Sequence, residues 1–238
     1  FQADPFTVGL LMATYSLTQL IAAPLWGSMS DRIGRRPVLL ITLGGAAASY
    51  IWLGFVDSLF ALFAARAVGG AMAGNISAAF AYMADITTKE NRAKGMGLIG
   101  AAFGLGFIAG PAIGGLLAGA DPATANYSLP AFAAAGLSLV ALCFAILILK
   151  ESLSEEIRAR IAARPPENRF RRLLETLRTP KLGFLIILSF LATFVFAGME
   201  ATFAMWSGRT YQWGPQQTGF LFAGVGIVSA IIQGGLIG

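Results

Sequence analysis

Long stretches without a charged residue constrain the fold of this chain more than any other feature of its sequence. Six such windows hold at least 18 residues each, and they cover residues 5–30, 38–56, 95–120, 122–149, 182–199 and 210–238. A seventh window, residues 58–84, is interrupted only by Arg66. An apolar run of about 20 residues can cross the hydrocarbon core of a membrane as a helix. The sequence therefore predicts an all-α, polytopic membrane helical bundle with about seven transmembrane helices.

The overall composition agrees with a membrane protein and excludes several kinds of site. Hydrophobic residues make up 56% of the chain and charged residues 12%, whereas soluble domains carry about 25% charged residues. The chain has no histidine and one cysteine, Cys143. This excludes a disulfide framework, a Cys/His zinc site and histidine acid–base chemistry. We expect no enzymatic activity, no metal and no cofactor.

The basic residues are concentrated in every second connection between the windows. Residues 30–37, 85–94 and 150–181 hold 15 of the 17 lysines and arginines. Basic residues close to helix ends mark the cytoplasmic side of a membrane protein. We therefore expect these three connections to be cytoplasmic in a multi-pass protein of the cell membrane. The sequence pI of about 9.7 then reflects topology, and we expect no binding to nucleic acid.

Two further segments fit this topology. Trp206, Tyr211 and Trp213 cluster beside the sixth connection, as aromatic side chains do at a membrane interface, which predicts an outer-face turn. Residues 151–180 form the one soluble-looking stretch. Within it, Phe170, Leu173, Leu174 and Leu177 have helical spacing and lie opposite arginines. This pattern predicts a basic amphipathic helix against the inner leaflet, and we interpret the segment mainly as a tether.

The first and last windows begin alike. Phe1-Gln2-x-x-Pro5-x-x-x-Gly9-x-Leu11 matches Tyr211-Gln212-x-x-Pro215-x-x-x-Gly219-x-Leu221 at an offset of 210 residues. Both windows run inward in the predicted topology, and such repeats are typical of transporters built from two parallel halves. This predicts a first half bundle in residues 1–150 (helices 2–6), a central loop in 151–180 and the start of the second half in 181–238 (helices 7 and 8). We expect the chain to be an internal part of a protein with about 12 helices.

The first cytoplasmic connection has a specific spacing of small and charged residues. Gly27 allows close packing at the end of a helix, and Gly34 permits a tight turn. Asp31 can cap or face a helix N-terminus, and Pro37 suits the first turn of the next helix. An ordinary cytoplasmic turn, rich in basic residues, would account for the arginines but not for the spacing of Gly27, Asp31 and Gly34.

The connection resembles the signature loop of the major facilitator superfamily, G-x-L-A-D-R-x-G-R-[KR], with Met29 and Ser30 as departures. In that family the acidic and basic residues of the loop contribute to a cytoplasmic gate that holds the outward-open state. The resemblance thus implies a gate motif made of Gly27, Asp31, Arg32, Gly34, Arg35 and Arg36.

Two further patterns resemble motifs of the same family. Arg66 lies in the middle of an apolar window, where a charge costs about 2.5 to 3.5 kcal/mol on insertion scales, so we expect it to face a polar cavity or an acidic partner. It resembles the arginine of the family's fourth helix, which is linked to proton transfer. A run of small residues resembles the fifth-helix motif of drug/proton antiporters. Its residues are Gly106, Gly110, Pro111, Gly114 and Gly115, and close helix packing explains them equally well.

The overall resemblance is to bacterial tetracycline/proton antiporters and their multidrug relatives. It rests on residues 15–19 and 23–24 and on the loop at residues 84–87. Ser49 stands where tetracycline exporters carry an acidic residue. Because of this departure, we expect an unspecified amphiphilic drug as the substrate.

Few polar residues are available inside the windows for proton or substrate binding. Glu200 is the one acidic residue within a predicted span, and burial would make its proton exchangeable near neutral pH; it could equally lie at the outer interface. Gln19, Asn75 and Gln233 are candidate hydrogen-bond donors of a substrate cavity, or hydrogen-bond partners of other helices.

These features predict a secondary active transporter that exports drugs or small amphiphilic molecules in exchange for protons. The expected partners are membrane lipid, a small-molecule substrate and protons, and we expect a monomer. Proton-coupled uptake of a small metabolite and a membrane sensor without transport activity are the alternatives.

Overall fold

The computed structural model describes residues 4–153, 158 and 175–235, and the side chains of residues 233–235 lie outside the description. In these segments the chain is helical. The helices are α1 (Pro5–Ile33), α2 (Arg35–Gly54), α3 (Leu59–Ala73), α4 (Ile76–Ile86), α5 (Arg92–Ala118), α6 (Ser128–Ile148), α9 (Pro180–Tyr211) and α10 (Pro215–Gly235). Seven spans in this part of the chain are long and apolar enough to cross a membrane, with α3 and α4 forming one of them. The predicted all-α bundle and its seven spans are confirmed.

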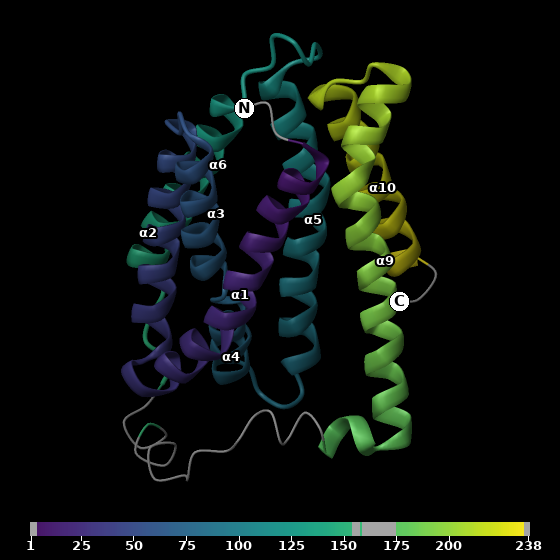
Figure 1. The fold of residues 1–238 in the computed structure, drawn as a ribbon. Helices are drawn as coiled ribbons and strands as arrows, with labels where there is room; N and C mark the ends of the chain where they lie inside the picture. Colours follow the sequence, from purple (N-terminus) through teal and green to yellow (C-terminus); the bar gives the residue numbers. More distant parts are fainter. Residues whose placement is uncertain (1–3, 154–157, 159–174, 236–238) are drawn as a thin grey trace.

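The helices run roughly alongside one another, and the chain reverses direction between successive spans, whereas α4 continues in the direction of α3 (Figure 1). The connections α1–α2 and α4–α5 lie at the same end of the bundle as the start of α9. We call this end the basic end, because it carries the described basic residues of 30–37, 85–94 and 175–181. Many large apolar side chains point outward, such as Phe184 and Phe194, which are 65% and 67% exposed. An outward apolar surface is what a hydrocarbon environment requires.

Residue types at the helix ends explain where several helices begin. The carboxylate of Asp4 accepts a hydrogen bond from the backbone N–H of Thr7, and Pro5 opens α1. Ser58 caps α3 in the same way through the N–H of Ala61. The matched prolines of the predicted repeat, Pro5 and Pro215, are the first residues of α1 and α10. The two windows therefore begin their helices at equivalent positions.

The span predicted for residues 58–84 is interrupted, which the sequence pattern did not predict. Helix α3 ends at Ala73 and α4 begins at Ile76, with Gly74 and Asn75 between them. A Cβ on Gly74 would meet the backbone of α1 at Ala22 and Ala23. The close approach of α1 thus requires glycine at the interruption.

Side chains of α1 satisfy the backbone around this interruption. Trp26 Nε1 donates to the carbonyl of Ala71 at 2.7 Å, and Gln19 Nε2 donates to that of Ala73 at 3.3 Å. An unpaired carbonyl is costly in a membrane because no water is available to it. These two side chains of α1 therefore stabilise the interruption between α3 and α4.

The aromatic cluster predicted at the turn after residue 206 is present. Trp206 and Tyr211 rings are 5.4 Å apart, and Tyr211 and Trp213 rings are 5.6 Å apart. The cluster lies at the end of the bundle opposite the basic end (Figure 1). The amphipathic helix predicted within residues 151–180 falls largely on residues 159–174, which lie outside the described residues.

Candidate functional site

The predicted gate motif forms a tight connection between two antiparallel helices. Helix α1 ends at Ile33 and α2 begins at Arg35, so Gly34 alone joins them. Gly34 has φ 112°, a backbone conformation that is strained for residues with a side chain. The predicted turn at Gly34 is confirmed. It brings Asp31, near the end of α1, close to Arg35, which lies four residues later at the start of α2.

Arg35 is the centre of the charge network at the basic end. Its side chain is buried, with 6% of the residue exposed. Its Nη1 donates to Asp31 Oδ1 at 2.5 Å and to Ser30 Oγ at 2.8 Å, and its Nε donates to Asp85 Oδ2 at 3.1 Å. Asp31 belongs to α1 and Asp85 to α4. A single guanidinium of α2 therefore ties together the ends of three helices.

Glu151 is a second acidic residue at this end, and it faces the first turn of α2. Its carboxylate accepts the backbone N–H groups of Arg35 at 2.9 Å, Arg36 at 3.1 Å and Leu153 at 2.9 Å. Partial burial by itself would raise the pKa of Glu151, but these N–H donors outweigh it and hold the pKa below its ordinary value. The carboxylate is therefore charged at neutral pH and stabilises the N-terminus of α2.

The sequence pattern did not predict the roles of Asp85 and Glu151. In the sequence, Asp85 belongs only to the loop resemblance at residues 84–87, and Glu151 belongs to the predicted central loop. The hydroxyl of Ser152 also donates to Asp85 Oδ2 at 3.1 Å. The available signal for both acidic residues is their position one or two residues after a long apolar run, at the end that holds the arginines.

The other residues of the gate motif have more peripheral positions. Arg36 donates from Nη2 to the carbonyl of Ile146 at the end of α6, at 3.0 Å. Arg32 is exposed. The carbonyl of Gly27 accepts the hydroxyl proton of Ser30 at 2.8 Å. Within this motif, Asp31 and Arg35 are therefore the pair that makes the buried contact.

The carboxylate of Glu151 gives a prediction about pH and stability. Because its pKa is lowered from 4.5, its contribution is present above that value and is lost as the pH falls through the lowered pKa. The stability advantage of the wild-type protein over Glu151→Gln should thus stay constant between about pH 6 and pH 8 and shrink only in stronger acid. Thermal unfolding of the purified full-length protein across this pH range measures it.

The control for this prediction is Asp57→Asn, a charge change at an exposed position away from the gate motif. Its effect should not follow the acid profile of Glu151→Gln. A wild-type advantage that changes between about pH 6 and pH 8 would show that Glu151 titrates there and would contradict the assignment.

Arg66 lies on α3 within the membrane span and contacts an aromatic ring. Its guanidinium carbon is 4.6 Å from the centroid of the Tyr15 ring on α1. No ion pair of Arg66 occurs among the described residues, where the ion pairs are those of Arg35 with Asp31 and Asp85. Of the two expected environments, a polar cavity or an acidic partner, the acidic partner does not occur in the described part of the chain, and the contact found is with Tyr15.

The candidate cavity residues take part in contacts between helices. Asn75 Nδ2 donates to the hydroxyl of Thr42 on α2 at 2.8 Å, and Gln19 binds the carbonyl of Ala73 as described above. The side chain of Gln233 lies outside the described residues. Of the two interpretations left open, the structure shows helix-to-helix hydrogen bonds for Gln19 and Asn75.

Glu200 and Arg66 belong to different parts of the bundle. Glu200 lies on α9 and is exposed, and the structure brings no described residue into an ion pair with it. The predicted proton-coupling residues Arg66 and Glu200 are therefore not brought together in this arrangement.

The small residues of α5 form the contact surface for α10. A Cβ on Gly115 would lie 2.6 Å from the carbonyl oxygen of Pro215, and a Cβ on Gly219 would meet the carbonyl of Pro111. Gly106, Gly110 and Gly114 have no such neighbour within 4 Å. One face of the motif thus packs backbone to backbone against α10, as expected for closely packed small residues.

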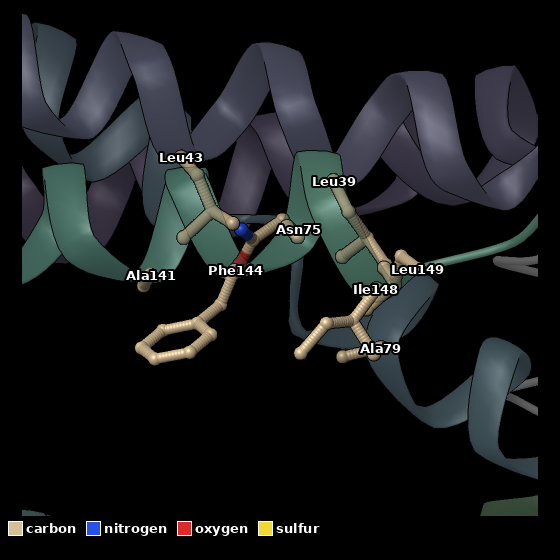
Figure 2. Close-up of a pocket in the computed structure, with 9 residues that line it drawn as sticks. Leu39, Leu43, Asn75, Ala79, Ala141, Phe144, Ile148 and Leu149 are labelled. Carbon is tan, nitrogen blue, oxygen red and sulfur yellow. The ribbon is translucent and has the colours of Figure 1, made fainter.

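An apolar pocket of about 480 Å³ lies between α2, α4 and α6 (Figure 2). Eight of its nine lining residues are apolar, and Asn75 supplies the one polar side chain. Leu39 and Leu43 of α2 line it together with Phe144 and Ile148 of α6. The lining of the pocket therefore favours an apolar molecule, and it contains no charged side chain that could bind a charged one.

Comparison with known proteins connects this architecture to one family. The sequence profile of the Major Facilitator Superfamily matches residues 1–238. Multidrug resistance protein 2 of Bacillus subtilis (strain 168) is 32% identical over 228 residues, which cover 95% of this chain and 56% of that protein. The class C tetracycline resistance protein of Escherichia coli is 35% identical over 230 residues, covering 94% of this chain and 55% of that protein.

A solved structure is similar as well. The human organic anion transporter MFSD10 (TETRAN) matches with a TM-score of 0.68 and 30% identity, covering 95% of this chain and 55% of that one. The chain spans about half the length of the curated relatives that it matches. The family consists of transporters and not of enzymes, in agreement with the expectation from the sequence. The chain belongs to the Major Facilitator Superfamily and is a multi-pass membrane protein.

Proposed function

We propose that the full-length protein exports small amphiphilic molecules across the cell membrane in exchange for protons. The observation that carries the proposal is the buried network at the basic end, in which Arg35 joins Asp31 and Asp85. A buried arginine shared by three helices makes a rigid unit that opens or closes as a whole. We therefore interpret this network as part of a gate and not as a loop that only connects helices.

Alternating access requires two bundles that move against one another. We assign residues 1–150 to the first bundle, 151–180 to the central loop and 181–238 to the start of the second bundle. The close packing of α10 along α5 is then a contact between the two. The names of the relatives, which are drug resistance proteins and an organic anion transporter, support small organic molecules as substrates.

The proton is proposed to be carried by Glu200, an acidic side chain in the interior of α9. Arg66, a basic side chain in the interior of α3, is proposed to influence this step or the substrate that competes with it. One proton moving through 100 mV supplies about 2.3 kcal/mol, which is sufficient to drive export against a gradient.

The test uses the full-length protein in proteoliposomes with an imposed pH gradient and fluorescent amphiphiles of different charge. Proton entry should drive an amphiphile in the opposite direction, and a protonophore should abolish this movement. Movement of the amphiphile together with protons would show uptake and replace the proposal. No movement of any probe, by a protein of wild-type stability, would indicate a sensor without transport activity.

A further inference from the structure

Arg66 has hydrogen-bonding capacity that the described residues leave unused. No hydrogen bond or ion pair of this side chain occurs among them, and its contact is with the Tyr15 ring. Within this part of the chain, the buried side-chain nitrogens that lack a partner are Arg36 Nε and Arg158 Nε. The nitrogens of Arg66 are therefore not enclosed by the described residues. At membrane depth such donors require a polar partner.

The ring of Tyr15 is the described contact of this guanidinium, whose central carbon lies 4.6 Å from the ring centroid. The N–H groups of an arginine form a planar fork that matches the two oxygens of a carboxylate. A contact with an aromatic ring gives these N–H groups no carboxylate partner.

The residues packed behind Arg66 carry no negative charge. Ser49 of α2 is 4% exposed, and its hydroxyl donates to the carbonyl of Ala65 at 2.9 Å. A Cβ on Gly69 would lie 2.8 Å from Ser49 Oγ and 3.6 Å from the Tyr15 ring. Ser49, Tyr15 and Gly69 therefore surround this part of α3 with neutral groups.

Other described groups are less suited to an anion. Arg35 is already shared between two carboxylates, and Arg36 donates to the end of α6. The pocket between α2, α4 and α6 contains no charged side chain. Arg66 is thus a cation in the interior of a described span, away from the helix ends, and no described acid forms an ion pair with it.

We propose that Arg66, held by the ring of Tyr15, binds the carboxylate of an anionic amphiphilic substrate. This inference rests on the proposed function and specifies its substrate class. The carboxylate would supply the negative charge that the surrounding side chains lack. Its pairing with a partly desolvated guanidinium would favour an anion over a neutral molecule of the same shape.

The test compares two probes in proteoliposomes that hold the full-length protein: pyrenebutyrate and its neutral primary amide. The wild-type protein should transport the carboxylate in preference to the amide. Arg66→Gln should lower carboxylate transport by about tenfold or more, since a hydrogen bond to a charged group is lost. Amide transport should fall much less than carboxylate transport, and the unfolding temperature of the purified variant shows whether it is folded.

A second pair of variants changes Ser49, one of the neutral residues packed against this part of α3. Ser49→Asp places a carboxylate behind Arg66 and should remove the preference for pyrenebutyrate, because the guanidinium then has an internal partner. Ser49→Ala removes the same hydroxyl without adding charge and should keep the preference. An equal loss of both probes in Arg66→Gln, together with an unchanged preference in Ser49→Asp, would overturn the proposal.

The outcomes separate this proposal from the proposed function. Proton-driven export of a cationic amphiphile without any transport of pyrenebutyrate would overturn the anion site and leave the proposed function intact. Absence of proton-driven export for every amphiphile would overturn the proposed function. In that case, pyrenebutyrate binding by the wild-type protein that Arg66→Gln weakens would still support the anion site, and binding that Arg66→Gln leaves unchanged would overturn it.

Discussion

Replacement of Arg35 by methionine should abolish transport by the full-length protein and strongly lower its thermal stability. Arg35 is buried and binds both Asp31 and Asp85. Methionine has a similar length but no charge, so two carboxylates are left close together without their shared cation. Breaking a buried ion pair by removal of one partner costs about 3–5 kcal/mol. Substrate flux in proteoliposomes and the unfolding temperature measure the two effects.

Arg32→Gln is the matched control for this prediction. It removes an arginine from the same corner, but Arg32 is exposed, so its loss should have a small effect on stability. The backbone N–H of Arg35 still reaches Glu151 in the methionine variant, so the start of α2 stays capped. Near-wild-type stability and transport of Arg35→Met would contradict the central role of the network.

Replacement of Gly115 by valine should separate α10 from α5 and eliminate most of the transport activity. The Cβ of the new side chain would lie 2.6 Å from the carbonyl oxygen of Pro215 and 3.0 Å from the Cα of Gln216. These are backbone atoms, which cannot rotate away as a side chain does. Overpacking of this kind costs about 1–3 kcal/mol, and the proposed contact between the two bundles would be displaced.

The neighbouring residue gives the control. Gly114 lies one position earlier on α5, where a Cβ would have no neighbour within 4 Å. Gly114→Val therefore makes the same chemical change on the same helix without the clash. Cross-linking between cysteines placed on α5 and α10 follows the contact directly. Equal effects of the two valines would contradict a specific role for the Gly115 contact.

Local properties of the sequence were sufficient to predict most of the fold. Helices of about 20 apolar residues are specified by length and hydrophobicity alone, and the seven predicted spans were confirmed. The turn at Gly34 was also predicted, because a backbone at φ 112° favours glycine regardless of what lies around it. The prolines that open α1 and α10 belong to the same class of local signal.

Contacts between distant residues could not be predicted in this way. Arg35 and Glu151 are 116 residues apart, and Arg35 and Asp85 are 50 apart. Acidic residues in loops usually face water, and the position of Glu151 shortly after an apolar run does not specify which groups its carboxylate binds. The interruption of α3–α4 at Gly74 and Asn75 is similar, because its carbonyls are satisfied by Trp26 and Gln19 from another helix.

Hydrophobicity and motif spacing along the chain were sufficient to predict the number of spans and the family. The tertiary structure decided which charged groups meet: Arg35 with Asp31 and Asp85, and Arg66 with the Tyr15 ring. The physical reason is that a charge in a low-dielectric environment needs a partner within a few ångströms. Which residue lies at that distance depends on how the helices pack.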